Sequence, residues 1–199
     1  MTLLLGWSNT ARMSDPYFFG YGSLVNTKTH VYQDARPAKL SGWRRVWKRT
    51  NVRDMAFLTI VPSDRTELLG LIAKVPNADW VALDAREEGY DRLVATEMIT
   101  HYHSDNPELA IYAIPEATRF PPTPDHPILL SYLDVVLQGY LHVFGEVGVQ
   151  HFMETTDGWD TVVLNDRANP IYPRAQSLST NETALVDDCL KHVGAQIRN

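Results

Sequence analysis

A short aromatic run near the start of the chain ends abruptly in a glycine-rich turn. Tyr17-Phe18-Phe19 is uninterrupted by polar residues, which is typical of a buried strand. Gly20-Tyr21-Gly22-Ser23-Leu24 follows, and its two glycines allow the chain to turn where side chains would clash. Such a loop can direct several backbone N–H groups at one point and bind an anion there. The sequence therefore predicts a core strand that ends either in a plain tight turn or in a loop that cups a carboxylate or phosphate.

Charge and cysteine content narrow the possible partners of such a loop. The 199 residues include 18 Lys and Arg against 24 Asp and Glu, a net charge of −6, so nothing attracts nucleic acid or anionic membranes in general. An anionic ligand must then be held by local donors. No apolar run approaches the roughly 20 residues of a membrane span. Cys189 is the single cysteine, which fits a reducing, cytoplasmic compartment.

The chain divides into three parts by composition. Met13-Ser14-Asp15-Pro16 has the character of a natural start, so we expect residues 1–12 to be an upstream extension and residues 1–15 to precede the folded core. Residues 16–120 are expected to form that core. Pro121-Pro122-Thr123-Pro124 is a stiff connector to a helical extension, residues 121–199, that packs on it.

The core favours an α+β fold built on a small mixed β-barrel with a flanking helix. Several short apolar runs separated by turns are typical of a barrel, and residues 69–75 alternate with the period of a strand. Pro62-Ser63-Asp64-Arg65 is interpreted as a hairpin connection between two of the runs. Beyond the first aromatic run, the expected strands are residues 40–47, 55–61, 68–75, 96–103 and 109–114.

Three helices are expected. The first is capped by Asn77, runs towards Glu87 and ends at Gly89. The second spans residues 129–144 and stops at Gly145. The third opens with the capping box Ser179-Thr180-Asn181-Glu182. Its expected apolar stripe consists of Val186, Cys189, Leu190, Val193 and Ile197. Residues 157–174, between the last two helices, show no period.

The end of the first helix carries a cluster of acidic residues, Leu83-Asp84-Ala85-Arg86-Glu87-Glu88-Gly89-Tyr90. A carboxylate there faces the negative end of the helix dipole, which disfavours its ionisation. If it is also buried, its pKa rises towards the range that is useful for proton transfer. The alternative is a solvated helix end, in which Arg86 forms ion pairs with acidic residues three or four positions away.

Taken together, these two segments resemble the γ-glutamylcyclotransferase-like superfamily over roughly residues 16–115. Tyr21-Gly22-Ser23-Leu24 matches the substrate loop of that group, and Leu83-Asp84-Ala85-Arg86-Glu87 matches its catalytic segment, with the glutamate at Glu87. Arg86-Glu87 followed by Gly89-Tyr90 looks most like the ChaC-like branch, as does Gly42-Trp43-Arg44-Arg45. Glu88 stands where that branch usually has a glycine, so Glu88 remains an alternative to Glu87 for the active position.

The resemblance implies cyclisation of a small γ-glutamyl compound to 5-oxoproline with release of an amine. Glu87 would act as general acid and base, and the backbone N–H groups of Gly22, Ser23 and Leu24 would hold the α-carboxylate. Tyr21 and Tyr90 would hydrogen-bond the substrate, or else be packed core aromatics. No metal, nucleotide or other cofactor is implied. The alternatives are a carboxylate-binding module without turnover and an amide hydrolase that uses the same carboxylate.

Other candidate sites have ordinary structural explanations. His101 and His103 would face one side of a strand but have no evident third metal ligand. Cys189 fits an apolar helix face better than a nucleophile. Asp157, Asp160 and Asp166 lack calcium-loop spacing and are expected to cap turns.

Two basic segments also invite a functional interpretation. Residues 43–49 mix aromatic and basic side chains, and we expect the apolar ones to face inward and the basic ones outward rather than to bind nucleic acid. Arg167 and Arg174 flank Asn169-Pro170-Ile171-Tyr172-Pro173. This segment is either a surface loop or a loop that folds over the barrel mouth and places an arginine at a second carboxylate of the substrate.

Overall fold

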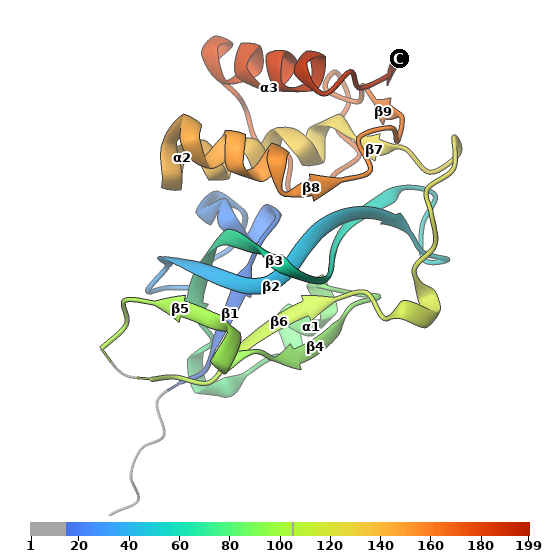
Figure 1. The fold of residues 1–199 in the computed structure, drawn as a ribbon. Coiled ribbons are helices and arrows are strands. Elements are labelled where there is room, and N and C mark those ends of the chain that lie inside the picture. The colour runs from blue at the N-terminus through green and yellow to red at the C-terminus, as the bar shows by residue number, and fades with distance from the viewer. Residues whose placement is uncertain (1–14, 105) are drawn as a thin grey trace, which may run out of the picture.

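A curled mixed sheet forms the centre of the molecule (Figure 1). The structure is a computed structural model and describes residues 15–104 and 106–199, so the predicted start at Met13 and the extension before it lie outside the described residues. The sheet has the strand order β4-β6-β1-β3-β2-β5, and β8 pairs with β2. Its strands are β1 (Tyr17–Gly20), β2 (Arg36–Arg49), β3 (Ala56–Lys74), β4 (Asp91–Val94), β5 (Ile99–His101), β6 (Leu109–Ala113) and β8 (Thr156–Asp157). A second sheet of order β10-β9-β7 consists of β7 (Ile128–Leu129), β9 (Val163–Leu164) and β10 (Ile197–Arg198).

Strand β1 lies in the middle of this sheet, as the aromatic run predicts. It pairs with β3 in antiparallel and with β6 in parallel orientation, and Tyr17, Phe18 and Phe19 are all almost fully buried. A strand covered on both faces requires a continuous apolar run rather than an alternating one. The sheet curls into a half-barrel with few helices around it, which confirms the predicted fold class.

The predicted hairpin at Pro62–Arg65 is wrong, because β3 runs without reversal along β2. Ser41 pairs with Glu67 and Trp43 pairs with Pro62, so residues 63–66 bulge opposite Gly42 alone. Gly42 takes a φ of 83°, and the Ser63 and Thr66 hydroxyls are hydrogen-bonded to each other at 2.9 Å. The turn-forming residues therefore bend a long ribbon through a wide bulge instead of ending it.

Two other strand predictions need adjustment. Residues 96–103 begin with a single 3₁₀ turn, Thr96–Met98, and only Ile99–His101 pair as a strand, whereas the strand at residues 109–114 is confirmed. The sequence predicts that Arg45 faces outward, but its side chain is fully buried, on the same face of β2 as Trp43 and Trp47. With a period of two, an arginine flanked by two inward tryptophans must itself point inward.

The helices are α1 (Val81–Arg86), α2 (Leu130–Glu154) and α3 (Thr180–His192). Asn77 is not the cap of α1: it sits in a 3₁₀ turn with a φ of 56°, and the Asp79 carboxylate accepts a hydrogen bond from the Val81 N–H instead. Gly145 breaks the helical geometry of α2 as expected, but the helix resumes and continues to Glu154. The capping box of α3 is confirmed. Ile197 lies beyond α3, exposed in β10, and not on its apolar stripe.

Helix α2 covers one side of the half-barrel, and α3 packs on its outer surface (Figure 1). The later part of the chain also contributes β8 to the main sheet, and the division at residue 120 stays a prediction. None of the helices in residues 15–104 and 106–199 combines the length and hydrophobicity that a bilayer crossing requires.

Gly139 on α2 permits the closest approach between this helix and the loop that follows β1. A Cβ atom there would lie 2.7 Å from the Asn26 backbone nitrogen, and the Asn26 side chain donates to the Val135 carbonyl at 2.9 Å. We expect Gly139→Ala to destabilise the fold by about 1–3 kcal/mol, because backbone must move to admit the methyl group. Denaturant unfolding measures this. Val147→Ala, at an exposed α2 position, is the control, and equal stability of both variants with wild type would contradict the close approach.

Candidate active site

Two adjoining cavities open where β1 ends. The smaller, of about 30 Å³, has room for one or two water-sized groups. All six site residues expected from the sequence line it: Tyr21, Gly22, Ser23, Leu24, Glu87 and Tyr90. The larger, of about 560 Å³, shares Ser23, Leu58, Glu87, Tyr90 and Tyr132 with the first. The two sequence segments, more than 60 residues apart, are thus brought to one place.

The two glycines of the loop are required by close contacts. A Cβ on Gly20 would lie 2.5 Å from the Leu24 Cβ, and one on Gly22 would lie 2.7 Å from the Tyr132 hydroxyl. Neither glycine has a positive φ, so the constraint is space rather than backbone conformation. The chain then enters a 3₁₀ turn, Ser23–Val25, whose first N–H groups have no partner within the turn itself. The chain therefore turns tightly here, which both alternatives predicted from the sequence require.

Buried donors fix the orientation of the peptide between Tyr21 and Gly22. The Tyr21 carbonyl accepts from the Arg45 Nε at 2.9 Å and from the Tyr140 hydroxyl at 3.0 Å. Because the C=O and N–H of a trans peptide point in opposite directions, the Gly22 N–H points away from that pair. Arg45 also donates to the Leu69 carbonyl and the Thr155 hydroxyl, so this buried cation is held by neutral acceptors.

Arg86 connects the loop to the glutamate. Its guanidinium donates to the Ser23 hydroxyl at 3.2 Å and to the Thr29 carbonyl at 2.9 Å, and its Nε lies 3.2 Å from the Glu87 Oε1. The side chain is only 7% exposed. Arg86 is therefore not part of a solvated helix end with ion pairs three or four residues apart, and it holds the two candidate segments together.

Glu87 is a largely buried carboxyl, with its side chain 17% exposed, at the C-terminal end of α1. Burial raises its pKa, and the charges of Arg86 and Arg174 oppose that rise. The Glu88 side chain, in contrast, is 65% exposed and lies 3.5 Å from the Arg53 guanidinium. Of the two glutamates, only Glu87 lines the small cavity, so the geometry favours Glu87 for proton transfer.

Four tyrosines surround Glu87: Tyr21, Tyr90, Tyr112 and Tyr132. Burial raises the pKa of each of them, and the Glu87 charge adds to the rise, so all four phenols stay protonated at neutral pH. Tyr21 donates to the Tyr112 carbonyl and Tyr90 to the Leu58 carbonyl, both at 2.7 Å. The Ser23 backbone hydrogen-bonds the Tyr132 hydroxyl, which lowers the Tyr132 pKa against the effect of burial.

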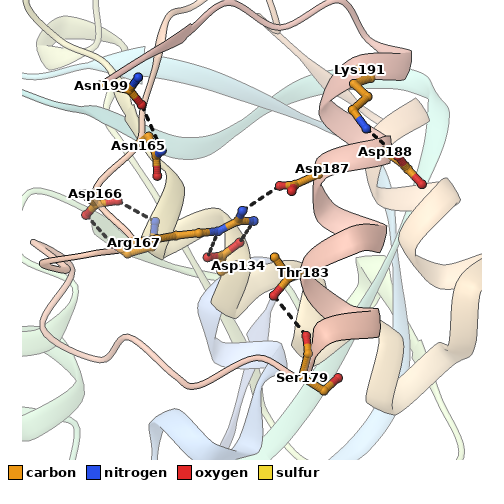
Figure 2. A network of polar contacts seen from close by, with 11 residues as sticks. Asp134, Asn165, Asp166, Arg167, Ser179, Thr183, Asp187, Asp188, Lys191 and Asn199 are labelled. Atoms are coloured by element: carbon orange, nitrogen blue, oxygen red, sulfur yellow. Dashed lines mark hydrogen bonds and ion pairs between the residues drawn. The ribbon is translucent and has the colours of Figure 1, made fainter.

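Ile171, Tyr172, Pro173 and Arg174 form one wall of the larger cavity, so this segment folds over the site as the second interpretation expected. Asp166 holds the segment to the start of α2. Its carboxylate accepts from the Ser131 N–H at 2.8 Å, the Ser131 hydroxyl at 2.5 Å and the Ile171 N–H at 2.9 Å. Next to it, Arg167 bridges Asp134 of α2 and Asp187 of α3 (Figure 2). Arg167 therefore links α2 to α3 through ion pairs, and Arg174 is the arginine that lines the cavity.

The family model described as "ChaC-like protein" matches residues 16–120. The chain belongs to the ChaC-like family. It is also similar to the solved structure of a protein named γ-glutamyl cyclotransferase, with 14% identity, a TM-score of 0.55, and coverage of 87% of this chain and 99% of that one. An uncharacterized protein from Homo sapiens gives 16% identity, a TM-score of 0.53 and the same coverage. No curated protein matches. These likenesses confirm the γ-glutamylcyclotransferase-like fold, and the family match confirms the branch.

The other candidate functional residues of this ChaC-like chain lie outside the two cavities. His103 is within 2.9 Å of the Tyr17 hydroxyl and 3.3 Å of Asp34, at the opposite end of β1 from the glycine loop. In the part of the chain that is described, no three His, Cys, Asp or Glu residues are placed to share a metal ion. Cys189 is half-buried, and burial raises the pKa of its thiol, which suits a packing role. Asp157 pairs with Arg44 at 2.6 Å.

Four residues that shape the site are not among those predicted from the sequence: Arg45, Arg86, Tyr112 and Tyr132. Arg86 stood within the catalytic segment but was considered only as a surface ion-pair partner. An arginine on the tryptophan face of a strand was the available signal for Arg45. Tyr112 lies in an apolar strand and Tyr132 in an apolar helix, where no pattern distinguishes a cavity-lining hydroxyl from a packed aromatic.

Proposed function

We propose that this protein is a γ-glutamyl cyclotransferase that converts a γ-glutamyl compound into 5-oxoproline and a free amine. The observation that supports this most is that Glu87 and the loop Gly22-Ser23-Leu24 line the same small cavity. In the proposed complex the loop amides hold the α-carboxylate of the glutamyl group. The α-amine is then positioned to attack the γ-carbonyl of the same molecule, and intramolecular ring closure needs little beyond positioning and proton transfer.

Glu87 supplies both proton transfers in this proposal. As a carboxylate it takes a proton from the α-ammonium group, and the freed amine forms the new C–N bond. It then gives this proton to the departing nitrogen as the original C–N bond breaks. The regenerated carboxylate takes the second proton from the ring nitrogen and passes it to the released amine, which leaves as an ammonium ion. The Tyr132 phenol, protonated at neutral pH, stabilises the tetrahedral oxyanion together with the loop amides, whereas the Tyr21 and Tyr90 hydroxyls already donate to backbone carbonyls. Arg86 keeps Glu87 next to the loop.

The assay incubates the protein with glutathione, γ-glutamyl amino acids and γ-glutamyl amines and follows 5-oxoproline by mass spectrometry. Formation of 5-oxoproline with a stoichiometric amine is the expected result. Free glutamate in its place would indicate amide hydrolysis by the same carboxylate. Saturable binding with neither product would indicate a carboxylate-binding module.

The pH profile provides a second test. Glu87 must be ionised to accept the ammonium proton, and its pKa is raised by burial. Activity is therefore lost as the pH falls through that raised pKa. The apparent pKa of the acid limb of kcat/KM should lie above about 4.3, the ordinary value for a glutamate side chain. Rate measurements from pH 4 to 9 locate this limb. An acid limb at or below the ordinary value would argue against a buried Glu87 as the base.

A further inference from the structure

The larger cavity continues directly from the reaction site. It shares Ser23, Glu87 and Tyr90 with the small cavity, so a γ-glutamyl group held there projects its leaving half into this space. Its volume, about 560 Å³, falls within the range of about 300–1,000 Å³ that is typical of sites for drug-sized ligands. A leaving group of only a few atoms would leave most of this volume empty.

Apolar side chains form a large part of the wall. They come from Met55 just before β3, from β3 itself, from the end of β7 and from the segment after Asp166: Met55, Ala56, Phe57, Leu58, Leu129, Ile171 and Pro173. An apolar group of matching size gains free energy by leaving water for such a surface, whereas an unpaired polar group loses it. The leaving half that fits this wall is therefore bulky and apolar.

The charges at the cavity add a second requirement. Three of its residues are cationic: Arg53, Arg86 and Arg174. Arg53 lies against Glu88, and Arg86 is occupied by Ser23, Thr29 and Glu87. Among the described residues, none accepts a hydrogen bond from the half-buried Arg174 guanidinium or pairs with it. The Arg174 charge acts on Glu87 only at longer range, by lowering its pKa. A planar guanidinium whose donors are not taken up by a described residue is suited to a carboxylate.

The wall that carries Arg174 is held in place before any ligand arrives. Asp166 fixes the Ile171 N–H to the start of α2, and Tyr172 packs edge-on against Tyr132 with ring centroids 5.0 Å apart. A preformed wall lowers the entropic cost of binding. The contacts that a leaving group makes with this wall therefore affect kcat/KM without first having to order the wall.

Resting on the proposed function, we propose that the leaving half of the substrate is an α-amino acid with a bulky apolar side chain, whose carboxylate binds Arg174. The apolar side chain lies against Met55, Phe57 and Ile171. A polyamine leaving group is disfavoured, because it would bring a cation to a cavity in which three arginines outnumber two glutamates.

Three substrates separate the two requirements: γ-glutamyl-phenylalanine, γ-glutamyl-glycine and γ-glutamyl-2-phenylethylamine. Each is compared by kcat/KM for 5-oxoproline formation. We expect the phenylalanine compound to exceed the glycine compound by about 10- to 100-fold through burial of the ring. We expect it to exceed the phenylethylamine compound, which lacks only the carboxylate, by a similar factor.

The variant Arg174→Gln tests whether Arg174 is the residue that binds the carboxylate of the leaving group. It should bring the ratio of the phenylalanine to the phenylethylamine compound close to one, while Arg65→Gln, at an exposed position of β3, should keep the wild-type ratio. Equal rates for all three substrates, or an unchanged ratio in Arg174→Gln, would overturn the inference and leave the proposed function standing. Absence of 5-oxoproline from every substrate would overturn both.

Discussion

Glu87→Gln is expected to lower kcat for 5-oxoproline formation by about 10²- to 10⁴-fold, the usual contribution of a general acid–base group. The amide retains the size of the side chain, but it can neither accept the ammonium proton nor protonate the departing nitrogen. Substrate binding should change much less, since the loop amides that hold the α-carboxylate are untouched. Steady-state kinetics with the best γ-glutamyl substrate, together with calorimetric binding, measure both effects.

Glu88→Gln is the matched control. Its side chain is adjacent in sequence and exposed, so we expect wild-type kinetics. If Glu88→Gln abolishes turnover while Glu87→Gln keeps it, the catalytic glutamate is assigned one position too early. If both variants turn over normally, neither glutamate is the acid–base group and the proposed mechanism is wrong.

Arg167→Met is expected to destabilise the fold by about 3–5 kcal/mol, the usual cost of removing one partner from a buried ion pair. Arg167 donates to both oxygens of Asp134, at 2.7 and 2.8 Å, and to Asp187 at 2.6 Å (Figure 2). The Asp134 side chain is only 8% exposed, so without Arg167 it becomes a buried carboxylate with no cation. Denaturant unfolding at pH 7 gives the free-energy difference.

The loss of stability in Arg167→Met should depend on pH in a defined direction. Burial raises the Asp134 pKa, and removing Arg167 takes away the main opposing interaction. A carboxyl whose folded-state pKa is raised stabilises the fold below its unfolded pKa of about 3.9, and this contribution is lost as the pH rises through the folded value. The gap between wild type and Arg167→Met should therefore be smaller at pH 4 than at pH 7.

Asp187→Asn is the control for this pair, because the Asp187 side chain is 39% exposed. Its expected cost is about 0–1 kcal/mol, as for other solvent-exposed ion pairs. A cost equal to that of Arg167→Met, or a gap that widens on acidification, would show that Asp134 is not the group that needs Arg167.

Local sequence patterns predicted the elements that a contiguous run of residues specifies. The strand before the glycine loop followed from an unbroken aromatic run, and the capping box of α3 from a pair of side chains three residues apart. Both patterns can be recognised in neighbouring residues, although β1 itself is stabilised by pairing with the distant strands β3 and β6. The interpretation of Pro62–Arg65 failed because turn-forming residues fit a hairpin and a wide bulge equally well, and only the pairing of β2 with β3 distinguishes them.

The sequence by itself determined the family, the tight loop after β1 and the candidate glutamate, because each depends on short segments of contiguous residues. Tertiary structure decided the rest of the site. It brought Ser23 to Glu87 through Arg86, supplied Tyr132 from α2, and separated the roles of Arg167 and Arg174. Each of these contacts joins residues that are distant along the chain. Such residues come together only when the sheet curls and α2 packs over it.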